Sequence, residues 1–288
     1  MEREPFRAST SYGDLVGWVA GDGPPVVALH GGPGLNYEYL DDVVEELVPR
    51  FRVATFQQRG LAPSTIEGPF TVDQAVADVA SVLDALGWQK AYVVGHSWGG
   101  HLAFHVAHDL APRLLAVLSV DPLGGVGDGG TAVFGETLLA RTPEAHRARA
   151  RELDEKDTAG EATEAESLEA LRLVWSAYYA TPATAPTMPP MRTNRDTSRG
   201  LWRDLEARLP TLESTLPDIT VPVGVLVGAA SPMPPEDAGI ATARRIPGAW
   251  WVTVPGAGHF TWYEAPGCVL DAMLRLASGT SAPEPRTP

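Results

Sequence analysis

The chain has 288 residues, of which 44% are hydrophobic and 20% are charged, as in ordinary globular proteins with a buried core. Its formal net charge of −14 argues against nucleic acids and anionic membranes as partners, because both bind basic patches. One cysteine, Cys268, excludes an intramolecular disulfide, and without an apolar signal or membrane segment we expect a cytoplasmic protein.

The first 122 residues alternate short β-rich runs with segments of helical periodicity. The predicted strands are 15–19, 26–29, 52–56, 91–94 and 114–120, and the predicted helices are 37–48, 71–86 and 98–110. Near the C-terminus the alternation resumes, with strands at 223–227 and 250–254 and helices at 235–245 and 265–276. Such alternation predicts a mostly parallel sheet covered by helices on both faces.

The middle of the chain breaks this alternation. A Gly/Asp loop at 124–130 precedes a long acidic stretch of helical character, 136–180, and a second amphipathic stretch lies near 201–212. A helical block between two parallel strands predicts a lid over the carboxyl-terminal edge of the sheet, where such sheets bind ligands. We therefore divide the chain into a core of residues 1–123 and 216–277, a cap of residues 124–215, and a disordered tail of residues 278–288.

A G-x-S-x-G motif, within the sequence VVGHSWGG at 93–100, links the predicted strand 91–94 to a predicted helix. A serine in this context lies on a sharp turn that exposes its hydroxyl group. The glycines prevent collisions where strand, turn and helix crowd together. We interpret Ser97 as a nucleophile, and the alternative is a surface serine in a glycine-rich turn.

A second glycine-rich motif, HGGPG at 30–34, directly follows the predicted strand 26–29. Attack of a serine on a carbonyl group creates an alkoxide, which two backbone N–H donors can stabilise. We assign the N–H groups of Gly32 and Trp98 to this oxyanion hole. The alternative is a plain tight turn, and we expect His30 to hold the loop rather than to act as a base.

The general base of such a site is expected late in the chain, on a loop after the last strand. The segment PGAGHF at 255–260 follows the predicted strand 250–254 and contains His259. No other histidine occurs after His146. We therefore predict that His259 is the general base.

Three further histidines, His101, His105 and His108, share roughly one face of a predicted helix. This spacing suggests a metal site, but no pattern of cysteines or carboxylates accompanies it. We expect these side chains to pack against the sheet, and we expect no metal and no cofactor. We likewise expect His96, inside the serine motif, to be a packing residue and not a second base.

Together these motifs resemble the α/β-hydrolase family, over residues 13–276. The HGGPG loop, followed by QQRG at 57–60, is most similar to the branch that includes the proline iminopeptidases. The resemblance implies an α/β-hydrolase fold, with a mostly parallel central sheet flanked by helices and a helical cap inserted after the sixth strand. It also implies a Ser-His-Asp triad in which Ser97 and His259 supply the first two members.

The catalytic acid departs from the pattern of most relatives, which carry an aspartate after the strand that follows the cap. Here Ser231 stands at that position, and a serine lacks the charge that stabilises an imidazolium. Some relatives carry the acid at the end of the strand before the cap, where this chain has Asp121. We predict Asp121 as the acid; the alternatives are a simple turn residue before proline, or the weaker candidates Glu236 and Asp237. Replacement of Ser231 by alanine is expected to change little.

The segment that would bind a substrate amine also departs from the family. Proline iminopeptidases have a cap segment of the form W-x-x-W-E, whose glutamate binds the free α-amine of the substrate. The nearest stretch here is WSAYY, from Trp175, with Tyr179 at the carboxylate position. Glu166 and Glu169 are candidate replacements, and the resemblance does not extend to the residue that strict aminopeptidase activity requires. Trp175, Tyr178 and Tyr179 are predicted to enclose an apolar substrate, or alternatively to form the core of the cap.

The predicted function is that of a serine hydrolase that works through an acyl-enzyme. The expected partner is a small-molecule substrate: a partly apolar ester, lactone, thioester or amide. Proline iminopeptidase activity is one alternative, and a non-catalytic ligand-binding protein on the same scaffold is another. Haloalkane dehalogenases and epoxide hydrolases need a carboxylate nucleophile, so Ser97 argues against both activities.

Overall fold

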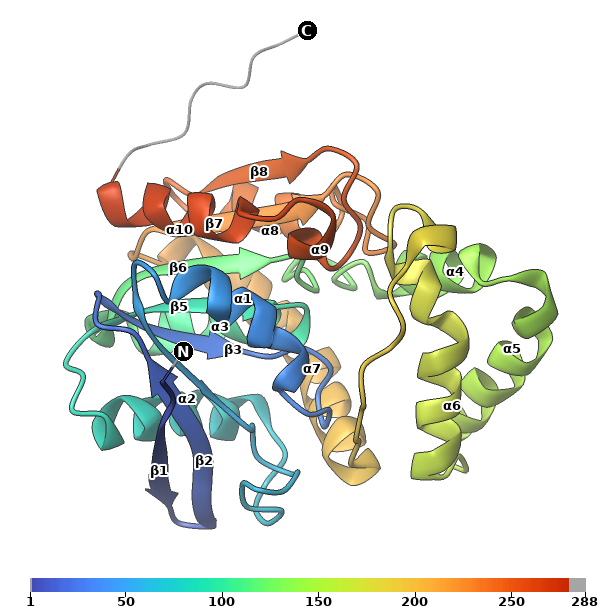
Figure 1. The fold of residues 1–288 in the computed structure, drawn as a ribbon, viewed down its shortest axis with the longest axis horizontal. Helices are drawn as coiled ribbons and strands as arrows, with labels where there is room; N and C mark the ends of the chain where they lie inside the picture. Colours follow the sequence, from blue (N-terminus) through green and yellow to red (C-terminus); the bar gives the residue numbers. More distant parts are fainter. Residues whose placement is uncertain (1, 280–288) are drawn as a thin grey trace, which may run out of the picture.

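An eight-stranded sheet organises the structure, a computed structural model that describes residues 2–279 (Figure 1). The strands are β1 Glu4–Thr10, β2 Gly13–Ala20, β3 Pro25–Leu29, β4 Arg52–Phe56, β5 Ala91–His96, β6 Leu114–Val120, β7 Val223–Gly228 and β8 Trp250–Val254. They lie in the order β1-β2-β4-β3-β5-β6-β7-β8, and β2 runs in the direction opposite to the other seven strands. This sheet confirms the predicted mostly parallel α/β architecture.

Helices cover both faces of the sheet, because its inner strands are apolar on both sides. In β3, Val26 and Ala28 belong to one layer of the core, and Val27 and Leu29 belong to the other. The helices of the first layer are α1 Asp41–Leu47 and α10 Cys268–Ser278. Those of the second layer are α2 Val72–Ala85, α3 Trp98–Asp109 and α8 Gly239–Arg245.

The sequence does not predict β1, because its residues, EPFRAST, show little apolar alternation. Only Ala8 of this strand is buried, as suits an edge strand that pairs with β2 alone. The tail predicted at 278–288 begins within α10, which ends at Ser278. Residues 280–288 of that tail lie outside the described residues.

Two predicted helices are shorter than expected. The helix predicted at 235–245 begins only at Gly239, after a turn. The helix predicted at 265–276 is preceded by a separate short helix, α9 Thr261–Glu264, because Gly267 adopts a left-handed conformation before α10. Both differences arise from turn residues that interrupt an otherwise helical pattern.

Four α-helices lie between β6 and β7, where the sequence predicts a cap. They are α4 Thr131–Arg141, α5 Glu144–Ala159, α6 Glu164–Val174 and α7 Arg195–Thr215. The predicted acidic stretch is divided because Pro143 precedes α5 and because Thr163 begins α6 with a capping box to Glu166. In Figure 1, α4, α5 and α6 stand at the side of the sheet toward which the strand arrows point.

Of the helices α4 to α7, α7 alone contributes buried residues to a layer of the core. Leu201, Leu205 and Leu209 belong to the same buried layer as α2 and α3. The Asp204 carboxylate also accepts the backbone N–H of Val72 at 2.7 Å, at the start of α2. The segment predicted as the cap therefore contains a helix of the core layer, and the domain boundaries stay a prediction.

The parallel strands end together at one edge of the sheet. Leu29 pairs with Gly95, and Val120 pairs with both His96 and Leu226. The loops that follow β3, β5, β6 and β7 therefore begin side by side. This edge is where parallel sheets bind ligands.

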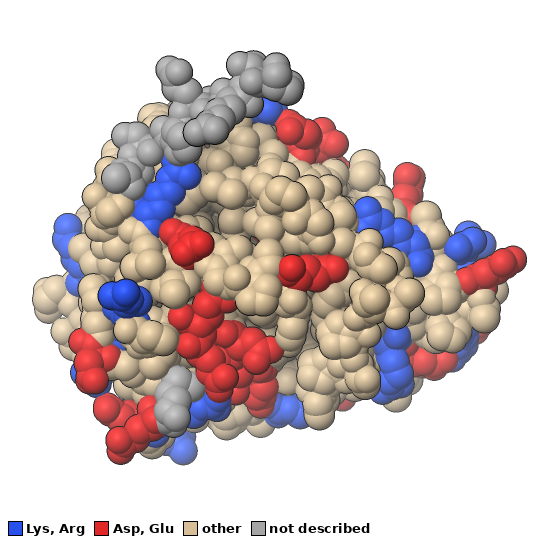
Figure 2. All heavy atoms as spheres, turned by 45° about the horizontal axis from the view of Figure 1, so that its top comes forward, with Lys and Arg blue, Asp and Glu red and all other residues tan. Residues whose placement is uncertain are grey.

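Most charged side chains lie on the surface. On the face in Figure 2, acidic side chains form a contiguous patch, in agreement with the net charge of −14. Ion pairs such as Arg113–Asp84, with Asp84 68% exposed, are worth at most about 1 kcal/mol each. Within residues 2–279 no helix is both long and apolar enough to cross a membrane.

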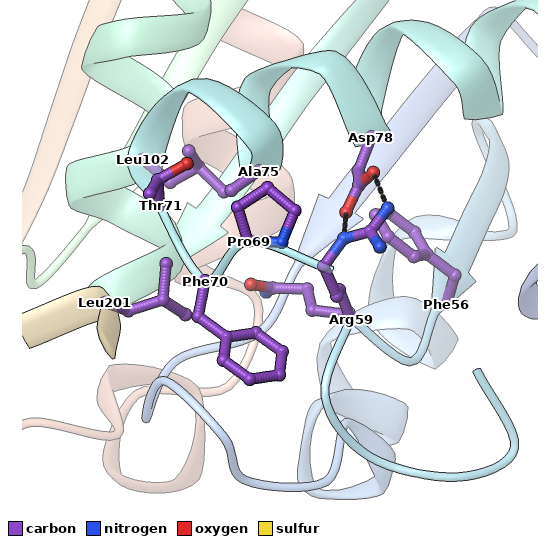
Figure 3. Close-up of a pocket in the computed structure, with 10 residues that line it drawn as sticks. Phe56, Arg59, Pro69, Phe70, Thr71, Ala75, Asp78, Leu102 and Leu201 are labelled. Carbon is purple, nitrogen blue, oxygen red and sulfur yellow. Dashed lines mark hydrogen bonds and ion pairs between the residues drawn. The ribbon is translucent and has the colours of Figure 1, made fainter. Parts of the chain in front are cut away.

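The ion pair between Arg59 and Asp78 is buried (Figure 3). Arg59 Nε and Nη2 donate to the two carboxylate oxygens of Asp78 at 2.9 and 2.6 Å. Arg59 also donates to the Glu67 carbonyl at 2.7 Å, and Gln74 donates to Asp78 at 2.9 Å. The pair borders a cavity of about 20 Å³, room for about one water molecule, and it ties the loop after β4 to α2.

We predict that Asp78→Ala lowers the free energy of unfolding by about 3–5 kcal/mol, because it leaves the Arg59 guanidinium buried without its partner. Asp84→Ala, on the same helix, removes an exposed partner and is expected to cost at most about 1 kcal/mol. Urea unfolding followed by circular dichroism measures both values. Equal losses in the two variants would contradict this account of the buried pair.

Candidate active site

Ser97 lies in the turn between β5 and α3. Its backbone has φ of 55° and ψ of −116°, outside the helical and extended regions. A Cβ atom at Gly95 would lie 2.0 Å from the carbonyl oxygen of Gly99, so the strand and the helix can approach this closely only with glycine. The turn holds Ser97 at the sheet edge, where it lines a large cavity.

Asp121 follows β6, the strand beside β5 in the sheet. Its φ is 43°, and within residues 2–279 Ser97 and Asp121 are the only non-glycine residues with positive φ. Such conformations cost about 1–3 kcal/mol each and persist where the surrounding structure fixes them, often at functional sites. The two outliers therefore mark this part of the sheet edge as a candidate site.

The Asp121 carboxylate accepts three hydrogen bonds. Its Oδ1 accepts the N–H of Gly228 at 3.0 Å, and its Oδ2 accepts from Ser231 Oγ and from His259 Nδ1, both at 2.5 Å. The carboxylate and the imidazole are both almost fully buried. Because Nδ1 of His259 carries the proton in this bond, Nε2 is the nitrogen that can accept one.

Ser231, at the position where most relatives carry the acid, lies against the Asp121 carboxylate, a contact that the sequence does not predict. Its hydroxyl donates to Asp121 and accepts the backbone N–H of Met233 at 3.1 Å, so it completes the surroundings of the carboxylate. Glu236, a weaker candidate for the acid, instead pairs with Arg244 at the surface, at 2.9 Å. The hydroxyl group of Ser231 thus lies beside the Asp121 carboxylate, the acid that the sequence predicts.

The loop that carries His259 is held from two sides. The His259 N–H donates to the Tyr178 carbonyl at 2.8 Å. The Glu264 carboxylate accepts the N–H groups of Gly258 and Ala180 at 2.7 and 3.0 Å. The segment after α6 therefore positions the imidazole, and Glu264 does so without belonging to any motif that the sequence reveals.

The glycine-rich loop after β3 directs the Gly32 N–H. His30 Nδ1 donates to the Gly31 carbonyl at 2.9 Å, and because the peptide group is planar and trans, the Gly32 N–H points the opposite way. Gly32 has φ of 61°, a conformation that favours glycine, and it lines the cavity. Burial lowers the pKa of His30 to about 4, so this imidazole is neutral near neutral pH and holds the loop.

Trp98 begins α3, so its backbone N–H belongs to the first turn, whose donors have no partner within the helix. Its indole N–H donates to Gln58 Oε1 at 2.9 Å, and Gln58 Nε2 donates to the His30 carbonyl at 2.8 Å. Gln58 therefore fixes the serine turn against the glycine-rich loop. The QQRG motif signals this position, although the sequence alone assigns it no role.

A cavity of about 800 Å³ lies between the sheet edge and helices α4 to α7. Ser97, Gly32, Trp98 and His259 all line it. Its apolar lining includes Phe134, Leu138, Leu139, Leu168, Leu171 and Val174, and its charged lining includes Glu136, Asp154, Asp157, Arg195, Arg199 and Glu206. The volume falls within the range of small-molecule sites.

Of the three aromatic residues predicted for the pocket, Trp175 and Tyr178 line the cavity and Tyr179 does not. Tyr179 is only 1% exposed, and its ring packs 5.8 Å from that of Trp175 within the core. It follows the 3₁₀ turn Trp175–Tyr178 in an extended conformation, which directs its ring into the core. The sequence does not identify Phe134, whose ring lies 5.8 Å from that of His259.

His101 and His105 face each other inside the core. His101 Nδ1 donates to the Gly124 carbonyl at 3.2 Å, so its Nε2 accepts the N–H of His105 Nε2 at 3.3 Å. Burial lowers the pKa of His101 to about 4 and that of His105 well below its usual value. In the part of the chain that the structure describes, no group of three or more His, Cys, Asp or Glu residues is arranged to hold a metal ion.

A family model for the alpha/beta hydrolase fold matches residues 24–266, and the chain therefore belongs to the α/β-hydrolase family. Solved structures agree on the fold. A thermophilic esterase from Thermogutta terrifontis has a TM-score of 0.66 at 24% identity, with 98% of this chain and 100% of the esterase covered. A hydrolase from Bacillus anthracis has a TM-score of 0.71 at 14% identity, with 96% and 99% covered. Identities this low show the fold alone.

Curated relatives match a shorter region. A soluble epoxide hydrolase from Corynebacterium sp. (strain C12) is 38% identical over 116 residues, which cover 38% of this chain and 40% of the relative. A proline iminopeptidase from Lactobacillus helveticus is 32% identical over 115 residues, 38% of each chain. The chain thus aligns with about two fifths of the length of these relatives. More than one branch of the family therefore resembles it.

The buried His101 predicts a pH dependence of stability. Its pKa is about 4 in the folded chain against 6.5 for an ordinary histidine, so between these pH values the unfolded chain binds a proton that the folded chain excludes. The free energy of unfolding therefore decreases as the pH falls through this window. His101→Asn retains a donor for the Gly124 carbonyl but does not titrate, and we expect a slope shallower by up to about 1.4 kcal/mol per pH unit.

Urea unfolding at several pH values from about 8 to about 4.5 measures this slope. At the highest pH, the difference between the free energies of unfolding of the wild type and the variant gives the packing cost of the substitution. This cost is separate from the slope with pH. Identical slopes for the two proteins would contradict the assignment of a neutral buried imidazole.

Proposed function

We propose that the protein is a serine hydrolase that works through an acyl-enzyme. The observation that carries the proposal is the bond from His259 Nδ1 to Asp121 Oδ2, on an imidazole that lines the same cavity as Ser97. A carboxylate bound at Nδ1 selects the tautomer whose Nε2 accepts a proton, and it stabilises the imidazolium that forms. The positive φ of both Ser97 and Asp121 supports the assignment.

In the first half-reaction, Ser97 Oγ attacks the substrate carbonyl while His259 Nε2 takes its proton. The N–H groups of Gly32 and Trp98 donate to the alkoxide that develops, an interaction whose loss typically costs about 10²–10³-fold in kcat. The imidazolium then gives its proton to the leaving alcohol, thiol or amine. The acyl group remains on Ser97.

In the second half-reaction, water replaces the leaving group. His259 Nε2 takes a proton from the water as it attacks the acyl carbonyl, and the same N–H groups hold the second alkoxide. Collapse of this intermediate returns the proton to Ser97 Oγ and releases the acid. In these steps His259 makes every proton transfer, and water is the only reactant besides the substrate.

The lining of the cavity supports a small, partly apolar substrate: an ester, lactone, thioester or amide. Phe134 and Tyr178 line the cavity with their rings beside that of His259, Trp175 also lines it, and the side chains of α6 add an apolar wall. Such a site binds through apolar burial and orients its ligand through few polar groups. A volume of about 800 Å³ admits a substrate much larger than an acetyl ester.

Proline iminopeptidase is the second candidate, because of the HGGPG and QQRG motifs and the identity to the Lactobacillus helveticus protein of that name. The position of its amine-binding glutamate is taken by Tyr179, which is buried. The candidate replacements pair outside the cavity, Glu166 with Lys156 at 2.6 Å and Glu169 with Arg149 at 2.9 Å. A prolyl amide with a free amine, compared with its N-acetylated form, distinguishes the two candidates.

Two other functions fit less well. An epoxide hydrolase needs a carboxylate nucleophile, and the turn carries Ser97 instead. A protein that only binds its ligand has no need of a strained serine beside a buried carboxylate and imidazole. We therefore place acyl transfer first.

Ser97→Ala tests the proposal. We expect the wild-type protein to react with a fluorophosphonate probe and to hydrolyse p-nitrophenyl acetate, and we expect the variant to lose labelling and at least about 10⁴-fold in kcat. Ser198→Ala, at another serine that lines the cavity, is the matched control and should retain both reactions. Labelling that persists in Ser97→Ala, or a folded wild-type protein that does not react with the fluorophosphonate probe, would contradict the proposal.

Asp121→Asn tests the acid. It is expected to lower kcat for p-nitrophenyl acetate by about 10⁴-fold, because the imidazolium loses its charged partner. Ser231→Ala removes one hydrogen bond to that carboxylate and is expected to cost roughly tenfold or more. Since Ser231 Oγ lies 2.5 Å from Asp121 Oδ2, the double variant Asp121→Asn/Ser231→Asp is expected to recover part of the activity.

Steady-state kinetics of the three variants test whether Asp121 is the acid that supports His259. Near-normal turnover in Asp121→Asn would show that another group supports His259. If Ser231→Asp restores no activity in the Asp121→Asn background, the two positions are not equivalent with respect to the imidazole.

A further inference from the structure

Tyr39 and His96 are buried polar residues to which the acyl-transfer mechanism assigns no step. They are 7% and 3% exposed, and both line the cavity that contains Ser97. Their rings lie 5.6 Å apart, and the ring of His96 lies 4.6 Å from that of His259. They therefore stand at the centre of the candidate site without touching the reacting atoms in the mechanism above.

The hydrogen bonds of these two residues form a chain between three loops. Tyr39 Oη accepts the N–H of Gly31 at 2.5 Å, in the glycine-rich loop. His96 Nδ1 lies 2.8 Å from Tyr39 Oη, and His96 Nε2 lies 3.1 Å from the carbonyl oxygen of His259. His96 itself directly precedes Ser97 in the chain. The oxyanion loop, the serine turn and the histidine loop are thus linked through two side chains.

Only one arrangement of protons satisfies every member of this chain. The His259 carbonyl only accepts, so His96 Nε2 must carry a proton. In a neutral imidazole Nδ1 is then an acceptor, and it takes the phenolic proton of Tyr39. Tyr39 Oη in turn accepts the Gly31 N–H, which can only donate. Every donor is matched to an acceptor, provided that His96 is neutral and Tyr39 is a phenol.

We propose that Tyr39 and His96 are positioning residues that hold the Gly32 donor, the Ser97 turn and the His259 loop in one fixed arrangement. The inference rests on the proposed function, because it assigns these loops their catalytic roles. Tyr39 holds the N–H of Gly31, and His30 holds its carbonyl group. Together these bonds fix the peptide groups on both sides of Gly31 and hence the direction of the Gly32 N–H. The bond from His96 to the His259 carbonyl fixes the position of the His259 loop relative to His96, and therefore relative to Ser97, the next residue in the chain.

The surroundings favour the required protonation states. Burial, and then electrostatic repulsion between the two imidazoles of His96 and His259, hold the pKa of His96 well below its usual value. Burial raises the pKa of Tyr39 above its usual value. The other two rings in contact with His96, those of Phe260 and Trp262, carry no titratable group. The chain of hydrogen bonds is therefore complete near neutral pH.

Two substitutions of His96 separate its two hydrogen bonds. Glutamine can place an N–H near the position of Nε2 and so retain the donor to His259, whereas asparagine can place a carbonyl oxygen near Nδ1 and retain only the acceptor for Tyr39. Tyr39→Phe removes both the acceptor of Gly31 and the donor to His96. Glutamine and phenylalanine nearly keep the volume of the residues that they replace, whereas asparagine is smaller than histidine, so the thermal midpoint of each variant is compared as well.

We expect His96→Asn and Tyr39→Phe to lower kcat for p-nitrophenyl acetate by about 10- to 100-fold, with KM changed by less than about threefold, since the loops move but the cavity remains. His96→Gln should recover most of the loss of His96→Asn. The double variant Tyr39→Phe/His96→Asn should lose less than the product of the two single losses, because both act on one chain of hydrogen bonds.

The rate of labelling by the fluorophosphonate probe is measured on the same proteins, together with their thermal midpoints. Variants that lose thermal stability but keep the wild-type kcat and labelling rate would show a merely structural role and overturn this inference alone. Equal kcat for His96→Gln and His96→Asn would overturn the assigned direction of the bond to His259. A wild-type protein that does not label would instead overturn the proposed function, and this inference with it.

Discussion

The carboxylate of Asp121 joins the ends of three neighbouring strands. It follows β6 and accepts hydrogen bonds from Gly228, the last residue of β7, and from His259, on the loop after β8. A buried carboxylate needs such donors, because an unpaired charge in the core is costly. The register of the parallel strands brings the donors to it, so the position of the imidazole depends on the sheet.

The same edge holds two residues in unfavourable backbone conformations. Ser97 and Asp121 each cost about 1–3 kcal/mol, and the packed layers of α3 and the sheet hold them in place. Hydrogen bonds add to this constraint: Ser97 N–H donates to the Val120 carbonyl at 3.0 Å, and Asp121 N–H donates to the Leu226 carbonyl at 2.7 Å. The strained residues are thus fixed by the strands beside them.

The sequence predicts the parts of the fold and the site that depend on local pattern. The alternation of strands and helices, the serine turn and the late histidine loop all have signals within a few residues, and the structure has a strand, a turn or a helix at each. The edge strand β1 lacks such a signal because it buries only Ala8. Tyr179 is misplaced for a related reason: the sequence does not tell which of two adjacent tyrosines faces the cavity.

The polar network around the site has no local signal at all. The bond from Ser231 to Asp121 joins residues 110 positions apart, and that from His96 to the His259 carbonyl joins residues 163 positions apart. Tyr39 lies in a segment that reads as an ordinary helix start, and Glu264 belongs to no motif. These contacts follow from the tertiary packing of loops at the sheet edge, which only the structure provides.

The proposed mechanism requires that an acyl group is attached to Ser97 during turnover. The most direct measurement is the mass of the protein and of its peptides after the reaction with p-nitrophenyl acetate is quenched in acid within the first turnovers. We expect one added acetyl group, located on the peptide that contains Ser97. Hydrolysis without any such adduct, or an acetyl group that accumulates and turns over on another residue, would contradict it.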